Sequence, residues 1–381
     1  MRRSEERILT THTGSLPRPA ELIPLLLERE RGAAVDPERF EALVRQAVQE
    51  CVRQQLANGI DIVSDGEMSK PSYVAYAKDR LTGFGGEGTI GLAADLADFP
   101  EYTANLRRHG LATAGAPRPA CNGPVRYCGE AELARDLQNF QAALASAGAV
   151  EGFLTAAAPG VIAVFLPNQY YPSHEAYIWA LAEAMKTEYQ TIAAAGIPLQ
   201  IDCPDLALSK NLQFPDLSLE EFRRVVAMHV EALNWALEGI PPENLRMHVC
   251  WGNYEGPHHK DVPLGAIVDL VLQARPRFLS IEAANPRHEH EWTVWQEVPL
   301  PEEKVLIPGV IDSTTNFVEH PELVCQRILR FARLVGRERV IAGTDCGFST
   351  GAAGGPVVPS VTWAKLRALR EGADRASALL W

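Results

Sequence analysis

The chain has 381 residues, of which 46% are hydrophobic and 22% charged, so it is long enough for two ordinary domains or for one large α/β barrel. Its net charge of -12, with no basic patch, argues against binding to nucleic acid or to an anionic membrane surface. No apolar run approaches the roughly 20 residues that span a bilayer, and no signal peptide opens the chain, which predicts a cytoplasmic protein with a small-molecule substrate. Its seven dispersed cysteines are typical of reduced thiols.

Short runs rich in Ile, Val and Leu alternate along the chain with longer amphipathic stretches, which is the pattern of βα units in a parallel sheet. The runs predict eight strands, at 8–12, 60–64, 153–157, 198–202, 245–250, 277–282, 304–309 and 339–343. The stretches between them predict helices at 36–58, 173–195, 218–238, 262–274 and 320–335. Eight such units predict a single (β/α)8 TIM barrel over residues 1–381. An open doubly wound sheet is disfavoured, because no Gly-x-Gly-x-x-Gly element follows the first strand.

The segment 83–150 breaks this alternation. It opens with a glycine-rich run at 83–88, contains Pro117 and Pro119, and ends in a predicted helix at 131–146. We expect a hairpin and a helix that form an insertion after the second strand, on the loop face of the barrel and not as a separate domain.

Four side chains of metal-ligand type stand at the ends of predicted strands. His248 and Cys250 are two residues apart, so on a strand they point to the same side. Glu282 closes the sixth strand and Cys346 follows the eighth. Because the carboxyl ends of barrel strands meet at one rim, we expect all four side chains to meet there. One imidazole nitrogen, two sulfurs and one carboxylate oxygen suit tetrahedral Zn²⁺, although a buried cysteine by itself is more often a small hydrophobic residue.

The first strand runs into a turn of small and polar residues. Thr13, Gly14 and Ser15 form this turn, in which Gly14 allows close approach of the backbone and Ser15 offers an N–H and a hydroxyl. The turn could hold a substrate carboxylate, with Arg18 available for charge. It could equally be an ordinary connection between a strand and a helix.

Acidic residues follow the second and fourth predicted strands. Glu67 and Asp202 are the candidate catalytic and substrate-binding residues, because two carboxylates at neighbouring strand ends can bind an ammonium group. Asp65 and Asp205, close to them in sequence, are also candidates for helix N-caps.

Histidines are frequent in the loops after the fifth and sixth strands. They could supply an acid or support a zinc ligand from behind, or simply face solvent. These residues are His258, His259, His288 and His290.

In their order along the chain, five motifs resemble the catalytic barrel of cobalamin-independent methionine synthase. Its superfamily also includes epoxyalkane:coenzyme M transferases. The motifs are Thr13-Gly14-Ser15, Asp65-Gly66-Glu67, Ile201-Asp202, His248-Val249-Cys250 and Asp345-Cys346-Gly347.

The resemblance implies a set of functional residues. It assigns the zinc ligands to His248, Cys250, Glu282 and Cys346. It assigns the homocysteine site to Ser15, Glu67 and Asp202.

The chain departs from that family in three respects. The full-length synthases carry an additional N-terminal barrel that helps to bind folate, and 381 residues have no room for it. Cys203 stands where the family motif has a glutamate. Thr314 stands where the synthases have a histidine that assists the folate leaving group. The methyl donor is therefore open.

The leading hypothesis is a zinc-dependent S-methyltransferase acting on homocysteine or a similar thiol. The alternative is a zinc-dependent epoxide or alkyl:thiol transferase of the coenzyme M type. In a third hypothesis the barrel is not an enzyme and zinc is structural. The expected partners are a small-molecule thiol and a methyl or alkyl donor, and a homo-oligomer stays among the alternatives.

Overall fold

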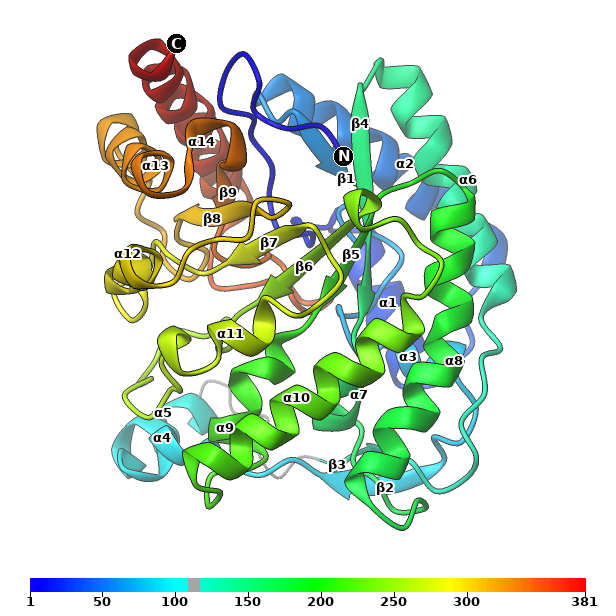
Figure 1. Cartoon of the computed structure of the whole chain (residues 1–381). Helices are drawn as coiled ribbons and strands as arrows, with labels where there is room; N and C mark the ends of the chain where they lie inside the picture. Colours follow the sequence, from blue (N-terminus) through cyan, green and yellow to red (C-terminus); the bar gives the residue numbers. More distant parts are fainter. Residues whose placement is uncertain (109–116) are drawn as a thin grey trace.

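A curled sheet of seven parallel strands organises the chain (Figure 1), shown here as a computed structural model that describes residues 1–108 and 117–381. The order in the sheet is β1-β4-β5-β6-β7-β8-β9. The strands are β1 (Ile62–Ser64), β4 (Glu151–Ala157), β5 (Leu199–Asp202), β6 (Leu245–Val249), β7 (Phe278–Ile281), β8 (Val305–Ile311) and β9 (Gly343–Thr344). The α/β class predicted from the alternation is confirmed.

Helices cover the outside of this sheet, and α13 packs along α14. The longer helices are α1 (Leu22–Glu30), α2 (Pro37–Ala57), α5 (Pro100–Arg108), α6 (Glu130–Ala147), α8 (His174–Ala194), α10 (Leu219–Ala236), α13 (Pro321–Val335) and α14 (Pro359–Leu380). The shorter ones are α3 (Ala77–Arg80), α4 (Ala94–Ala97), α7 (Pro159–Phe165), α9 (Leu208–Leu212), α11 (Val268–Val271) and α12 (Val294–Glu297). Single 3₁₀ turns lie at Pro204–Leu206, Pro242–Asn244, Leu264–Ala266, Glu289–Thr293 and Arg337–Arg339.

The predicted first strand, 8–12, is an extended segment and not a regular strand. It makes one parallel bridge, between Thr10 and Ala342, and on its other side Ile62 N donates to Thr10 O at 3.1 Å. One backbone donor of this segment bonds to a side chain and not to a neighbouring strand, since Thr10 N donates to the Asp61 carboxylate at 2.9 Å. The segment thus connects both edges of the seven-stranded sheet without forming a full ladder.

Several helical regions differ from the sequence-based expectation, since α1, α5 and α7 fall outside the predicted ranges. The stretch 262–274 is split into a 3₁₀ turn at Leu264–Ala266 and the short α11, and Pro263 stands directly before that turn. The helix α14 was not predicted, although it buries a stripe of small and apolar side chains against the rest of the chain.

Within 83–150, β2 (Gly86–Thr89) and β3 (Pro117–Ala120) form an antiparallel pair. In Figure 1 this pair lies at the bottom of the view, away from both chain termini and near the lower end of α8. The helix expected at 131–146 is α6. Residues 109–116 lie outside the described part of the chain.

Strand register places the polar side chains at one level. Asp202 at the end of β5 pairs with His248 of β6, and His248 pairs with Ser280 of β7. Apolar side chains fill the sheet below them, in a cluster formed by Leu9, Ile62, Phe153, Phe278, Val305, Ile307 and Ile341. The carboxyl ends of the strands are therefore the place where polar chemistry is concentrated. Among the described residues, no helix is long and apolar enough to cross a membrane.

Candidate metal centre and active site

The structure brings the four predicted metal ligands together. One ligand-type atom of each of His248, Cys250 and Cys346 lies within 4.8 Å of the other two. Cys346 Sγ is 3.5 Å from His248 Nε2 and 3.1 Å from Glu282 Oε1. All four side chains are buried. Three separate strand ends thus supply one compact donor set.

The ionisation of this cluster is strongly perturbed. A hydrogen bond from the Cys346 thiol holds the pKa of Cys250 well below its usual value, while burial raises the pKa of Cys346. Burial also raises the pKa of Glu282 to about 7. Although burial opposes it, the neighbouring Cys250 raises the pKa of His248. Of the four groups, Cys250 is therefore the one that these shifts favour as an anion, and a bound cation would favour the deprotonated forms of Cys346 and Glu282 as well.

The donor set fits a divalent transition metal such as zinc. Glu282 Oε2 is buried and has no hydrogen-bond partner among the described residues. His248 Nδ1 lies 3.2 Å from Ser280 Oγ, so its other nitrogen is the one directed at Cys346. A metal-bound histidine is usually held through its second nitrogen in this way. The set of one nitrogen, two sulfurs and one oxygen suits Zn²⁺.

Asp345 holds the loop that carries Glu282. Its carboxylate accepts hydrogen bonds from Ala283 N (2.8 Å), Ala284 N (2.9 Å) and Asn285 N (2.8 Å). Because Asp345 also precedes Cys346, one side chain fixes two of the four candidate ligands relative to each other. Sequence reasoning noted Asp345 only as part of a motif, since its partners lie about sixty positions away.

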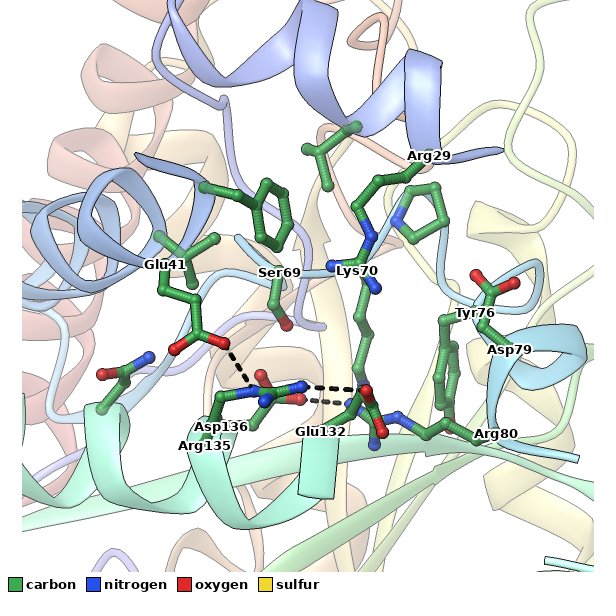
Figure 2. A pocket seen from close by; sticks show the side chains of 15 residues that line it. Arg29, Glu41, Ser69, Lys70, Tyr76, Asp79, Arg80, Glu132, Arg135 and Asp136 are labelled. Atoms are coloured by element: carbon green, nitrogen blue, oxygen red, sulfur yellow. Dashed lines mark hydrogen bonds and ion pairs between the residues drawn. The ribbon is translucent and has the colours of Figure 1, made fainter. Parts of the chain in front are cut away.

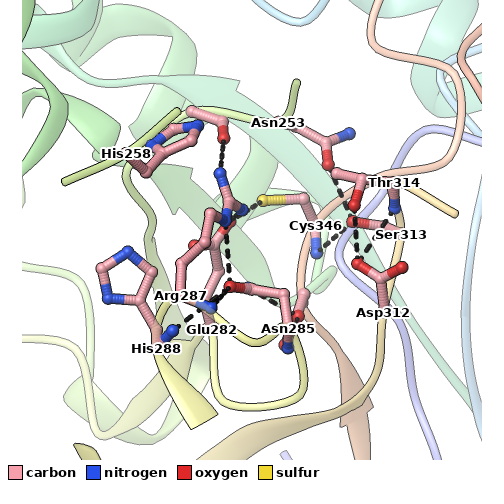
Figure 3. Close-up of polar contacts among 12 residues, drawn as sticks. Asn253, His258, Glu282, Asn285, Arg287, His288, Asp312, Ser313, Thr314 and Cys346 are labelled. Atoms are coloured by element: carbon pink, nitrogen blue, oxygen red, sulfur yellow. Dashed lines mark hydrogen bonds and ion pairs between the residues drawn. The ribbon is translucent and has the colours of Figure 1, made fainter. Parts of the chain in front are cut away.

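Further polar contacts support Cys346 (Figure 3). Cys346 N donates to Ser313 Oγ at 3.1 Å, and Ser313 Oγ donates to Asn253 Oδ1 at 2.8 Å. Thr314, next to Ser313, donates its hydroxyl to Asp312 Oδ1 at 2.8 Å.

Arg287 contacts the candidate ligand Glu282, which the sequence did not reveal. Its Nη2 lies 3.4 Å from Glu282 Oε1, and its Nη1 donates to Gly252 O at 3.1 Å. The guanidinium therefore places positive charge beside the carboxylate of the candidate ligand.

Glu67 sits in a constrained and buried position. It has φ +59°, the one positive φ of a non-glycine residue in the described part of the chain. Its Oε1 accepts from Thr155 Oγ1 at 3.0 Å, and its Oε2 is buried without a partner there. A Cβ on Gly14 would come within 2.7 Å of Glu67 Oε1, so the glycine makes room for this carboxylate. Lys70 donates to the carbonyl oxygen of the same Thr155 at 2.6 Å.

Asp202 is the second buried carboxylate. Its Oδ1 accepts from Gln200 Nε2 at 2.7 Å. Burial, and then the charge of Glu67, raise the pKa of Asp202 to about 7. A cationic partner would lower that cost, which is what a substrate ammonium would supply.

The turn that follows the segment 8–12 is tied to the end of β9. Thr13 Oγ1 donates to Thr344 O at 3.1 Å, and Ser15 Oγ accepts from Ser349 N at 3.3 Å. Arg18 donates to the carbonyl oxygens of Ser349 and Glu67, so its guanidinium holds loops together.

The nearby acids have separate roles. Asp65 caps no helix, because the chain forms a turn there, in which Asp65 Oδ1 accepts from Glu67 N at 3.0 Å. Asp205 does not cap a helix. It pairs with His229 Nδ1 at 2.8 Å instead.

The loop histidines divide into two groups. His258 and His288 both contact Asp261, at 2.7 and 3.1 Å, and the ring of His288 stacks on Trp251 with 3.9 Å between centroids. His259 is half-exposed and pairs with Asp98.

A cavity of about 50 Å³ lies beside α2 and α6 and is lined in part by Lys70 (Figure 2). Its charged groups largely pair with one another, as Arg80 does with Asp136 and Arg135 with Glu41. It lies apart from the candidate ligands.

The structure thus combines a parallel sheet with candidate metal ligands at the carboxyl ends of its strands, and known proteins resemble the chain. Residues 8–92 match the model for the catalytic domain of cobalamin-independent synthase. The resemblance inferred from the sequence motifs is confirmed.

Two characterised relatives span most of the chain. Methionine synthase from Thermococcus kodakarensis is 26% identical, over 89% of this chain and 86% of that protein. The 2-hydroxypropyl-CoM lyase from Xanthobacter autotrophicus is 24% identical, over 82% of each. Among solved structures, the B12-independent methionine synthase from Shewanella sp. W3-18-1, in complex with selenomethionine, has a TM-score of 0.74 at 21% identity and covers 98% of this chain and 99% of that one. This last likeness concerns the fold.

Proposed function

We propose that His248, Cys250, Glu282 and Cys346 hold one Zn²⁺. Their mutual contacts, their burial and the unpartnered oxygen of Glu282 support this assignment. When bound, zinc favours the thiolate form of a substrate thiol while leaving the sulfur nucleophilic. Thiol ligands of this kind persist in a reducing compartment such as the cytoplasm.

We propose that the protein is a thiol S-methyltransferase that acts on homocysteine or a similar amino-acid thiol. The observation that carries this proposal is that the buried carboxylate of Asp202 is in register with His248 of the donor cluster, and that the charge of the buried Glu67 acts on Asp202. In this role Glu67 and Asp202 bind and orient the substrate ammonium. The turn from Thr13 to Ser15 closes the site on the side of β9.

The charge of the donor set favours alkylation of sulfur over hydrolysis. Two thiolates and a carboxylate contribute about -3 against the +2 of zinc, whereas sites that generate hydroxide more often use three histidines or two histidines and a carboxylate. The methionine synthases among the relatives support the same choice.

The second candidate is an epoxide or alkyl:thiol transferase. Lys70, whose ammonium bonds to Thr155 O beside Glu67, and Arg287 place cations near the site that could receive a sulfonate. The similarity to 2-hydroxypropyl-CoM lyase also supports it.

Calorimetric titration of the zinc-loaded protein with homocysteine and with coenzyme M separates the two candidates. We expect homocysteine to bind and Asp202→Asn to weaken that binding at least tenfold, because the ammonium loses a charged partner. The matched control is Asp269→Asn, which alters an exposed ion pair with Arg223. Tight binding of coenzyme M without binding of homocysteine would favour the epoxide or alkyl:thiol transferase over the S-methyltransferase.

We also propose that the sheet closes into a (β/α)8 barrel, a single domain over residues 1–381, with 83–150 as an insertion. The segment 8–12 would take the place of the eighth strand of the barrel. In support, Arg246 of β6 donates to Thr11 Oγ1 (3.0 Å) and His12 O (2.9 Å), which binds that segment from the interior.

A further inference from the structure

His258 has one ring nitrogen held and the other free. Its Nδ1 lies 2.7 Å from Asp261 Oδ2, and its side chain is only 1% exposed. Its Nε2 is buried and has no hydrogen-bond partner among the described residues. A buried polar atom without a partner is costly unless a ligand or water meets it.

The carboxylate that holds His258 is itself fixed. Asp261 Oδ2 also contacts His288 Nε2 at 3.1 Å, and Asn211 donates to Asp261 Oδ1 at 3.2 Å. Although burial opposes it, the hydrogen bonds with the two histidines hold the pKa of Asp261 below its usual value, so Asp261 is ionised. An ionised carboxylate at Nδ1 orients an imidazole for proton transfer at Nε2.

The imidazole of His258 packs against the loop that follows Cys250. A Cβ built on Gly252 would be 3.9 Å from His258 Cε1, and Gly252 is two residues after Cys250. Gly252 O also accepts from Arg287, whose guanidinium lies beside Glu282 Oε1. Figure 3 shows His258, Arg287, Glu282 and Cys346 in one view of this region.

The reaction proposed above needs a proton for a basic leaving group. Thr314, at the position where the resemblance expects a donating histidine, directs its hydroxyl to Asp312. Thr314 is therefore engaged, and a proton donor is required elsewhere.

We propose that His258, oriented by Asp261, donates that proton. This inference rests on the proposed thiol alkylation. The substrate sulfur attacks the alkyl carbon, an S–C bond forms, and the bond from carbon to the leaving nitrogen or oxygen breaks. The leaving atom takes the bonding electron pair and the proton from His258 Nε2. In each cycle the substrate thiol gives up one proton and His258 takes one up, so the sum is thiol plus donor to thioether plus protonated leaving group.

The test compares donors that do and do not need a proton. The zinc-loaded protein and its His258→Gln variant are assayed for homocysteine and coenzyme M alkylation with 5-methyltetrahydrofolate, epoxypropane and iodomethane. Iodide leaves without a proton, whereas the amine and the epoxide oxygen need one. We expect His258→Gln to lower kcat about 100-fold or more with a proton-requiring donor and less than about threefold with iodomethane, with zinc content and KM for the thiol little changed.

Two variants complete the design. His259→Gln is the matched control, because that side chain is 45% exposed and pairs with Asp98 at the surface. Asp261→Asn should reproduce the donor-dependent loss in weaker form, since it acts through His258.

The outcomes are distinct. Equal losses with all donors, or no loss, would overturn the role of His258. Turnover of iodomethane alone by the unaltered protein would also overturn it, because no leaving group would then require a proton. Failure of every donor with either thiol would instead refute the proposed thiol alkylation itself.

Discussion

At the scale of single residues, chemically distinctive side chains at strand ends could be recognised from the sequence. His248, Cys250, Glu282 and Cys346 were predicted to meet, and their atoms do lie together. Arg287 was missed as a partner of Glu282, because nothing in an isolated arginine indicates which carboxylate it will contact. The pattern of residues thus predicts the candidate ligands better than it predicts the charged groups that contact them.

Replacing either cysteine of the cluster should remove the metal. We expect Cys250→Ala and Cys346→Ala each to lower the zinc content from about one per chain to well below half, because a thiolate ligand is lost. Elemental analysis after purification measures this. Cys128→Ala is the control, since that cysteine is exposed. Full zinc content in both cluster variants would contradict the ligand assignment.

Asp202 should lower the stability of the protein at neutral pH. Its folded pKa of about 7 lies above the ordinary value of 3.8, so the fold favours the protonated acid. Stability is therefore lost as the pH rises from about 4 to about 7. We expect Asp202→Asn to raise the free energy of unfolding at pH 8 by an amount on the order of a few kcal/mol, and to change it little at pH 4. Denaturant titrations at pH 4 and at pH 8 measure the difference. An equal effect of Asp202→Asn at the two pH values would refute the raised pKa of Asp202.

At the scale of elements, hydrophobic periodicity predicted most strands and helices to within a few residues. Two strands were exceptions. The segment 8–12 forms no ladder, because Asp61 takes a backbone donor that a ladder would need, and the predicted strand 339–343 is reduced to β9 and isolated bridges. The stretch 262–274 was read as one helix, since periodicity alone does not register the break at Pro263. Loops are hardest to predict, because their shape depends on distant partners such as those of Asp345.

The loop after β7 should depend on Asp345. In Asp345→Asn one of the accepting oxygens becomes a donor that faces backbone N–H groups, so the loop that carries Glu282 loosens. We expect a stability loss of about 1–3 kcal/mol and weaker zinc retention in competition with a chelator. Asp269→Asn, at the surface, should leave both unchanged. Unaltered zinc retention in Asp345→Asn would count against its positioning role.

The turn at Gly14 should control thiol binding and not metal binding. Its φ is +156°, and a Cβ there would meet Glu67 Oε1 and Thr155 Cγ2 at 2.7 and 2.9 Å. We expect Gly14→Ala to weaken homocysteine binding at least tenfold while zinc content stays near one. Gly265→Ala is the control, because a Cβ there would make only an ordinary contact, 3.6 Å from Val294 Cγ2. A normal affinity in Gly14→Ala would show that the turn does not shape the thiol site.

At the scale of the whole molecule, the alternation of strands and helices predicted an α/β fold with its polar chemistry at one end of a parallel sheet. Parallel strands with short connections bring distant segments to one level, as the pairing of Asp202 with His248 shows. The contacts between β6 and the segment 8–12 were beyond prediction, because Arg246 binds that segment across more than two hundred residues of chain.

A zinc ion held by His248, Cys250, Glu282 and Cys346 should bind the sulfur of the substrate thiol. X-ray absorption at the zinc edge, with and without homocysteine, measures this. We expect two sulfur neighbours without homocysteine and three with it, because the substrate sulfur joins those of Cys250 and Cys346. A zinc coordination shell that stays the same when homocysteine is added would refute thiol binding at zinc and indicate a structural metal.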